Sequence, residues 1–112
     1  MNYNDVEVEI PNVDGIKDLT VRWLISDKDG APNFAMRLFE VAPGGYSPYH
    51  QHVQEHETFI LEGEGVLKKE DGEIKFKAGD VFYIEPWEWH NFQNTGTEPL
   101  KFLCMLPYLK KE

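Results

Sequence analysis

Turn-forming residues interrupt this chain so often that no helix of ordinary length fits into it. Every stretch long enough for three helical turns contains a glycine, a proline or another break in the 3.6-residue hydrophobic period. The segments between these breaks are short, and they are either apolar or alternate apolar with polar residues, as strands do. These segments are residues 6–10, 19–25, 34–41, 50–52, 58–61, 66–69, 73–77, 81–84, 90–94 and 100–106. The pattern predicts an all-β fold, an antiparallel sandwich or barrel.

Three turn sequences indicate where the chain reverses. Asp71-Gly72 lies between two alternating segments and is a strong hairpin signal. Residues 43–45, Pro-Gly-Gly, predict a turn that ends one strand and leads into the next. Gly63 and Gly65 indicate a tight corner where side chains cannot be accommodated.

The length of the chain and its one cysteine set the fold's size and chemistry. The 112 residues predict a single domain, residues 1–112, that buries roughly two-thirds of its unfolded surface. Cys104 is the one cysteine, which excludes an intrachain disulfide and fits a reducing compartment. The first ten residues lack the features of a signal peptide, and the apolar runs are too short to span a bilayer. We therefore expect a cytoplasmic protein without membrane contact.

The charge of the chain argues against one class of partner. Twenty acidic residues face 11 basic ones, which gives a formal charge of −9. The basic residues form no cluster beyond two Lys-Lys pairs, and an acidic surface repels phosphate backbones. We therefore expect no nucleic-acid partner.

All four histidines of the chain lie in two of these segments. His50 and His52 are separated by one residue, so in an extended strand both imidazoles point to the same face. His56 has the same parity and can return to that face after a short bend at residues 53–55. His90 would complete the cluster from a neighbouring strand. The spacing therefore predicts that four imidazoles converge on one metal ion.

The ligand types narrow the choice of metal without deciding it. Imidazole nitrogens suit first-row divalent ions, and intrinsic affinity favours copper, nickel and zinc over manganese and iron. We expect manganese or iron to be the functional ion, with nickel and zinc as alternatives. Glu57 is an alternative carboxylate ligand, but its odd parity relative to the histidines predicts that it faces away.

The first histidine segment resembles the first of the two motifs of the cupin superfamily. Gly44, His50, His52 and Gly63 stand at the positions that this motif requires. His56 stands where the family usually has a glutamate. In this respect the chain is similar to small single-domain cupins with a four-histidine metal site, including a manganese-binding member from a hyperthermophile.

The second histidine segment resembles the second cupin motif. Gly79, His90 and Asn94 hold their places, and the histidine and asparagine are the positions that matter for a site. Glu85 and Trp87 stand where a proline and a glycine are usual, which changes the turn between them. The resemblance extends from about residue 21 to 107 and implies an antiparallel double-stranded β-helix, or jelly-roll barrel. It also implies a homodimer.

Four neutral imidazoles leave the double charge of a divalent ion uncompensated. In a largely apolar barrel this charge attracts an anion, so we expect a small anionic, chelating substrate. The resemblance to cupin dioxygenases implies a metal-dependent oxidoreductase that cleaves such a substrate with dioxygen. A non-catalytic binding or sensing module, or a cupin isomerase or lyase, is the alternative.

Four further residues are candidates for the substrate pocket. Arg37, in the middle of a strand, either points outward to acidic neighbours or points inward to bind a carboxylate. Trp87 and Phe92 lie close to the histidines in sequence and either line the mouth of the site or pack in the barrel. Cys104 either faces the cavity or is a small core residue.

Overall fold

A computed structural model describes residues 1–108, which form eight strands and two single-turn 3-10 helices. The helices are η1 (Tyr3–Asp5) and η2 (Asp27–Asp29). The strands are β1 (Lys17–Ile25), β2 (Phe34–Tyr46), β3 (His56–Glu62), β4 (Glu64–Lys69), β5 (Gly72–Lys77), β6 (Val81–Ile84), β7 (His90–Asn94) and β8 (Leu100–Pro107). No helix of the described residues is long and apolar enough to cross a membrane.

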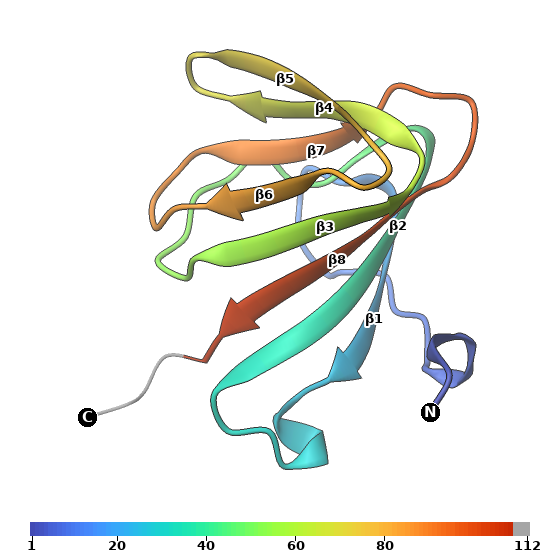
Figure 1. Cartoon of the computed structure of the whole chain (residues 1–112), viewed down its shortest axis with the longest axis vertical. Coiled ribbons are helices and arrows are strands. Elements are labelled where there is room, and N and C mark those ends of the chain that lie inside the picture. Colours follow the sequence, from blue (N-terminus) through green and yellow to red (C-terminus); the bar gives the residue numbers. More distant parts are fainter. Residues whose placement is uncertain (109–112) are drawn as a thin grey trace.

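The strands form one antiparallel sheet that curls into a jelly-roll barrel, which confirms the predicted fold class. The strand order is β5-β4-β7-β2-β8-β3-β6. Strand β1 is not part of this order and pairs with β2. Figure 1 shows the sheet curling from the β4–β5 hairpin to the long β1–β2 pair. The predicted hairpin forms, but its two turn residues are Glu70 and Asp71, because Gly72 already pairs with Lys69 as the first residue of β5.

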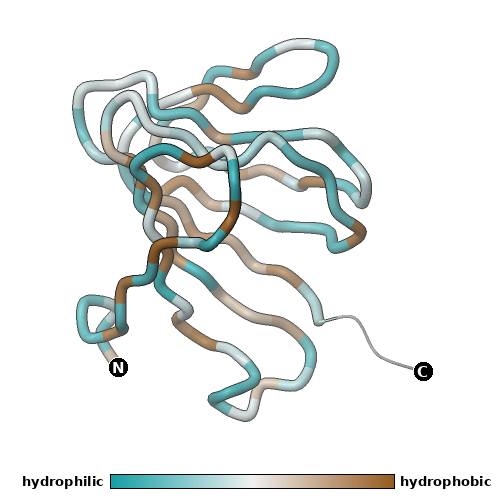
Figure 2. The backbone as a smooth tube through the Cα atoms, turned by 180° about the vertical axis from the view of Figure 1, so that it is seen from behind, coloured by the Kyte–Doolittle hydropathy of each residue, from teal (hydrophilic) through white to brown (hydrophobic). Residues whose placement is uncertain are grey.

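Alternation along the strands fills the barrel interior. In β3, His56, Thr58 and Ile60 are buried, whereas the residues between them are exposed. Figure 2 shows hydrophobic and hydrophilic residues interleaved along the chain rather than gathered into one long run. The inward residues make one core, formed by Leu19, Val41, Ile60, Leu67, Phe76, Ile84, Phe92, Leu100 and Phe102.

The predicted strand over residues 6–10 is wrong. In this segment only Glu9 pairs, through an isolated bridge in which its N–H and carbonyl each bond to Val21 at 2.9 and 2.8 Å. Val8 is 47% and Ile10 is 75% exposed, so the alternating apolar positions do not enter the core. A periodic pattern becomes a strand only where a partner edge and a buried face are both available.

The predicted turn at residues 43–45 is also wrong. The chain continues as β2 as far as Tyr46, and an irregularity in the β1–β2 register absorbs the extra residues opposite Lys17. Gly44 adopts a φ of +82°, which favours glycine. At Gly45 an added Cβ would lie 2.5 Å from the carbonyl oxygen of Lys17, so β1 approaches β2 closely there. The two glycines thus bend a long strand instead of ending it.

Candidate metal centre

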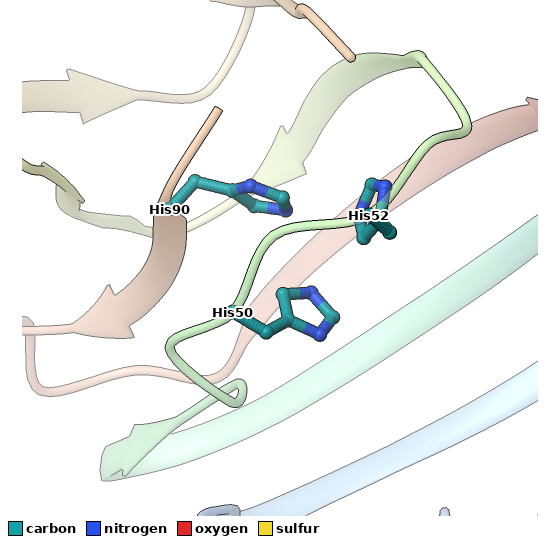
Figure 3. Close-up of side chains that lie close together, drawn as sticks. All are labelled: His50, His52 and His90. Carbon is teal, nitrogen blue, oxygen red and sulfur yellow. The ribbon is translucent and has the colours of Figure 1, made fainter. Parts of the chain in front are cut away.

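Three histidines meet at one point inside the barrel. The ligand nitrogens of His50, His52 and His90 all lie within 4.8 Å of one another. Figure 3 shows the three rings turned toward a common centre, two from the connection between β2 and β3 and one from the start of β7. His90 is buried and the other two are partly buried. Two segments far apart in the sequence therefore converge, and three of the four histidines predicted to share one cluster meet this distance criterion.

Backbone hydrogen bonds hold these segments together. The N–H of His50 donates to the carbonyl of His90 at 3.2 Å, and the N–H of His90 donates to the carbonyl of His50 at 3.0 Å. The N–H of Trp87 donates to the carbonyl of His52 at 2.8 Å. Residues 50–52 are therefore not the strand that the alternation predicted, and only His50 forms an isolated bridge, with His90. The alternation still places the two side chains on the same side.

Two backbone carbonyls fix the orientation of the rings. Nδ1–H of His52 donates to the carbonyl of Gln54 at 2.6 Å, and Nδ1–H of His90 donates to the carbonyl of Glu88 at 2.8 Å. This assignment leaves the Nε2 lone pair of each ring for a ligand. Nε2 of His52 is buried and has no hydrogen-bond partner. A buried acceptor without a partner fits a divalent metal ion, which binds neutral imidazole.

His56 lies beside this cluster. Its ring centroid is 4.2 Å from that of His52 and 6.1 Å from that of His90. Nδ1 of His56 lies 3.2 Å from the Sγ atom of Cys104. With Nδ1–H donating to this sulfur, Nε2 is left free, in the same way as in the other two rings. The sulfur then has the orienting role that backbone carbonyls have for His52 and His90.

The environment keeps all four imidazoles neutral. Burial lowers the pKa of His50 to about 4 and that of His56 to about 2, with the other imidazoles and Arg37 adding repulsion. Burial also lowers the pKa of His52 and of His90. The thiol of Cys104 has a raised pKa because it is buried. At neutral pH the site therefore presents uncharged nitrogen donors, the form that binds a metal.

The metal-free protein is expected to lose stability as the pH falls below 6.5. An unfolded histidine takes up a proton near pH 6.5, whereas folded His56 stays neutral down to about pH 2. Lowering the pH from 7.5 to 5.5 therefore stabilises only the unfolded state, by about 1.4 kcal/mol for this one residue. Thermal melts of chelator-treated protein would show a fall of several degrees. In His56→Gln the melting temperature should fall less over the same pH range. A melting temperature that does not change with pH would contradict the conclusion that the imidazoles are neutral.

A cavity of about 440 Å³ opens beside the histidines, within the usual range for small-molecule sites. His50, His56 and His90 form one part of its wall. The rest is mainly apolar, and the described residues that complete it are Leu19, Val21, Trp23, Phe39, Ser47, Pro48, Phe92, Phe102, Cys104, Arg37 and residues 9–13. The cavity can thus hold an organic ligand next to the histidine cluster.

Three of the four predicted pocket residues line this cavity. Arg37 points inward rather than to acidic neighbours, so the alternative of a surface ion pair is wrong. Phe92 and Cys104 are buried, at 4% and 3% exposure, and each both lines the cavity and packs inside the barrel. The expectation for Trp87 needs correction: it does not line the cavity and is 60% exposed. Its φ of +64° turns it out of the alternation.

Two acidic or polar candidates do not belong to the site. Glu57 is exposed and lies outside the cluster of ligand atoms, as its parity predicts. Asn94, which the motif associates with a site, is instead a structural residue. Its side chain donates to the carbonyls of Val41 and Glu98 and accepts from the N–H of Gly96, all at 2.8–2.9 Å. It ties the turn before β8 to β2.

Two parts of the cavity wall could not be predicted from the sequence. Residues 9–13 line the cavity although they form no strand. Trp23 lies opposite Arg37 in the β1–β2 register, and its ring packs under the guanidinium, 5.2 Å from its Cζ atom. The alternation in β1 places Trp23 on the inward face, but the register that brings it to Arg37 is set by the long-range pairing of β1 with β2.

Curated relatives differ in function and in length. An oxalate-binding protein from Thermotoga maritima is 35% identical over 101 residues, which are 87% of this chain and 83% of that protein. A 1-methylthio-D-xylulose 5-phosphate methylsulfurylase from Rhodospirillum rubrum is 37% identical over 71 residues, 63% of this chain and 46% of that protein. A gentisate 1,2-dioxygenase from Streptomyces sp is 34% identical over 64 residues, 56% of this chain but 18% of that enzyme. The chain thus spans less than half of two of these relatives.

A solved structure and a family model agree on the fold. The polyketide cyclase RemF from Streptomyces resistomycificus has a TM-score of 0.90 at 32% identity, over 99% of this chain and 86% of that one. The cupin-domain family model matches residues 37–106, which include all four histidines and more than half of the chain. The chain therefore belongs to the cupin superfamily.

Proposed function

We propose that this chain is a metal-dependent enzyme that acts on a small, anionic, chelating molecule. The observation that carries this proposal is the cluster of three histidines, with Nε2 of His52 unpartnered, beside a largely apolar cavity. His50, His52 and His90 would hold a divalent ion, and His56 would be the fourth ligand. Manganese or iron is the ion we favour, with nickel or zinc as alternatives.

The four imidazoles contribute no negative charge to the site. Bound there, the ion would act as a Lewis acid that polarises substrate oxygens and favours their ionised form. The imidazoles stay neutral, so they leave its charge for the substrate to balance. The apolar walls, including Phe92 and Phe102, exclude water and strengthen this attraction. These residues favour an enolate, a diol or a 2-oxo acid as substrate.

An oxidative reaction is the form of catalysis that we propose first. One relative is a gentisate 1,2-dioxygenase, which supports this choice. Gentisate and oxalate, named in two relatives, are both carboxylates with further oxygens that can chelate a metal. The shared part of the reaction would be binding of substrate oxygens beside the histidines, with the hydrophobic wall holding the carbon skeleton.

Oxygen uptake tests this function directly. Protein loaded with manganese or iron would be mixed with β-diketones, flavonols, 2-oxo acids and gentisate, and oxygen consumption recorded. We expect at least one substrate class to be consumed by the metal-loaded protein and not by His52→Ala. Gln51→Ala is the matched control, because Gln51 is exposed and lies between the two ligands. If these molecules bind to the metal-loaded protein but none is consumed, the dioxygenase proposal fails.

A non-catalytic binding function is the second candidate. The relative that aligns over 87% of this chain is named an oxalate-binding protein, and the word binding names no reaction. Under this function, calorimetry with metal-loaded protein would detect oxalate or a related dicarboxylate at micromolar to millimolar concentrations, and product analysis would find it unchanged. Conversion of the ligand, including isomerisation or elimination without oxygen, would argue for catalysis instead.

We also propose a homodimer. Large apolar side chains on the outer face of β3 and β6 are exposed: Phe59 and Leu61 by 40%, Tyr83 by 54% and Val81 by 67%. Phe59 lies directly opposite Val81 in the register, so the four side chains share adjacent strands. Such a face is suited to burial against a second copy. Light scattering should give twice the mass of the chain, 13.0 kDa, and Val81→Lys should yield the monomer.

A further inference from the structure

Arg37 is a partly buried cation without an acidic partner. The ion pairs of the described residues are Arg22–Glu40, Lys69–Glu88 and Lys101–Glu62, and none of them includes Arg37. Its Nε atom is buried and has no hydrogen-bond partner. Its Nη2 atom donates to the Sγ atom of Cys104 at 3.4 Å, and a thiol is a weak acceptor. The guanidinium therefore has unused donor capacity inside the protein, which is a costly arrangement unless a ligand supplies the acceptor.

Two aromatic rings hold the guanidinium in place. Its Cζ atom lies 5.2 Å from the centroid of Trp23 and 4.8 Å from that of Phe39. Trp23 and Cys104 stand on either side of Arg37 in the registers of β1 and β8 with β2. Aromatic stacking fixes a guanidinium plane and leaves its N–H edges for planar acceptors. Arg37 is thus oriented before any ligand arrives.

The guanidinium and the histidines share one cavity. Arg37 lines it together with His50, His56 and His90. One thiol links them, because the Sγ atom of Cys104 lies 3.4 Å from Nη2 of Arg37 and 3.2 Å from Nδ1 of His56. A single small molecule can therefore meet both the guanidinium and the metal ligands.

The charges around the cavity define the ligand. Arg37 is its one basic lining residue among residues 1–108, and Glu9 is the one acidic residue. Glu9 is exposed and makes no ion pair with Arg37, so the guanidinium has no internal counter-ion. One planar guanidinium suits an anion with two coplanar oxygens, such as a carboxylate, which it can meet with two parallel N–H···O bonds.

We propose that Arg37 binds a carboxylate of the substrate. A second oxygen-containing group of the same substrate would then reach the metal ion held by the histidines. The contact between the substrate and the metal rests on the proposed function, whereas the contact between the carboxylate and Arg37 does not. The substrate class is thus a carboxylic acid with a chelating diol, enol or oxo group on an apolar or aromatic body. The walls provided by Leu19, Val21 and Phe102 accommodate that body.

Two probes that differ only in a carboxylate test the inference. Calorimetry would compare 3,4-dihydroxybenzoate with catechol on manganese-loaded protein. We expect the acid to bind at least tenfold more tightly than catechol, since a charge-assisted pair with arginine contributes that much or more. Arg37→Gln should weaken binding of 3,4-dihydroxybenzoate by about tenfold or more and leave the affinity for catechol unchanged. The preference for the acid would then be lost. Arg37→Lys, which keeps the charge but not the planar fork, should give an intermediate ratio.

Arg22→Gln is the matched control for these variants. Arg22 lies on the neighbouring strand β1, but it pairs with Glu40 at 3.6 Å and does not line the cavity. The variant should keep the wild-type preference. A preference that survives Arg37→Gln in folded protein, or equal or absent binding of both probes by the wild type, overturns the inference. Catechol binding that does not depend on manganese instead overturns the proposed metal-dependent function, even where the carboxylate preference depends on Arg37.

Discussion

Replacing His90 with alanine is expected to lower the affinity for manganese or zinc by on the order of 100-fold or more. His90 is 3% exposed, and its Nδ1–H donates to the carbonyl of Glu88, which leaves Nε2 as the nitrogen that would bind the ion. A structural metal site gains roughly 10–16 kcal/mol from about four ligands, so one ligand accounts for a few kcal/mol. Competition with a metal-sensitive dye would measure the change.

The choice of variants separates ligands from neighbours. His50→Ala and His52→Ala should behave like His90→Ala, and His56→Ala should do so if it is the fourth ligand. Gln51→Ala should bind metal as the wild type does, since this side chain is exposed between the two ligands. Unchanged affinity in His90→Ala would contradict the metal centre. Unchanged affinity in His56→Ala alone would restrict the ligands to the three histidines of the cluster.

Replacing Gly65 with alanine is expected to destabilise the fold by about 3 kcal/mol or more. Gly65 lies in β4 between β5 and β7, opposite Phe76 on one side and Asn94 on the other. An added Cβ would overlap the carbonyl oxygen of Gln93 and lie 2.9 Å from the Phe76 ring. The obstacle is backbone, so the strands would have to separate. Urea unfolding followed by tryptophan fluorescence would measure the loss.

Gly96→Ala is the comparison for this variant. At Gly96 an added Cβ would lie 2.8 Å from Cγ of Glu64, the side chain of a surface residue that can move away. We expect a loss below about 1 kcal/mol there. Equal losses at the two glycines would show that the close approach of β4 to β7 is not what Gly65 serves.

The sequence was sufficient for the features that depend on local rules. The alternation of His50 and His52 placed both rings on one side even though residues 50–52 form only a bridge. The hairpin signalled by Asp71-Gly72 forms with its turn one residue earlier, and the eight strands from β1 to β8 follow from turn residues and alternation, apart from shifts at their ends. The motifs then supplied the barrel, because they tie the two histidine segments to a known family pattern.

Features that depend on distant contacts could not be predicted in this way. Residues 6–10 alternate as a strand does, but only Glu9 finds a bonded partner. The glycines at 44 and 45 are typical of a turn, and only the close approach of Gly45 to Lys17 shows why β2 continues. The closeness of Trp87 to His90 in sequence predicts a place near the pocket, but the backbone conformation at Trp87 turns its ring outward. The inward direction of Arg37 depends on the rings that flank it.

The reciprocal hydrogen bonds between His50 and His90 affect how the protein exchanges its ion. Because the backbone already joins the two ligand-bearing segments, the apo form keeps its donors assembled and need not refold to accept a cation. Loading would then need no folding step and would depend on the ions supplied around the protein. Which element occupies the site would accordingly follow cellular abundance as much as coordination preference.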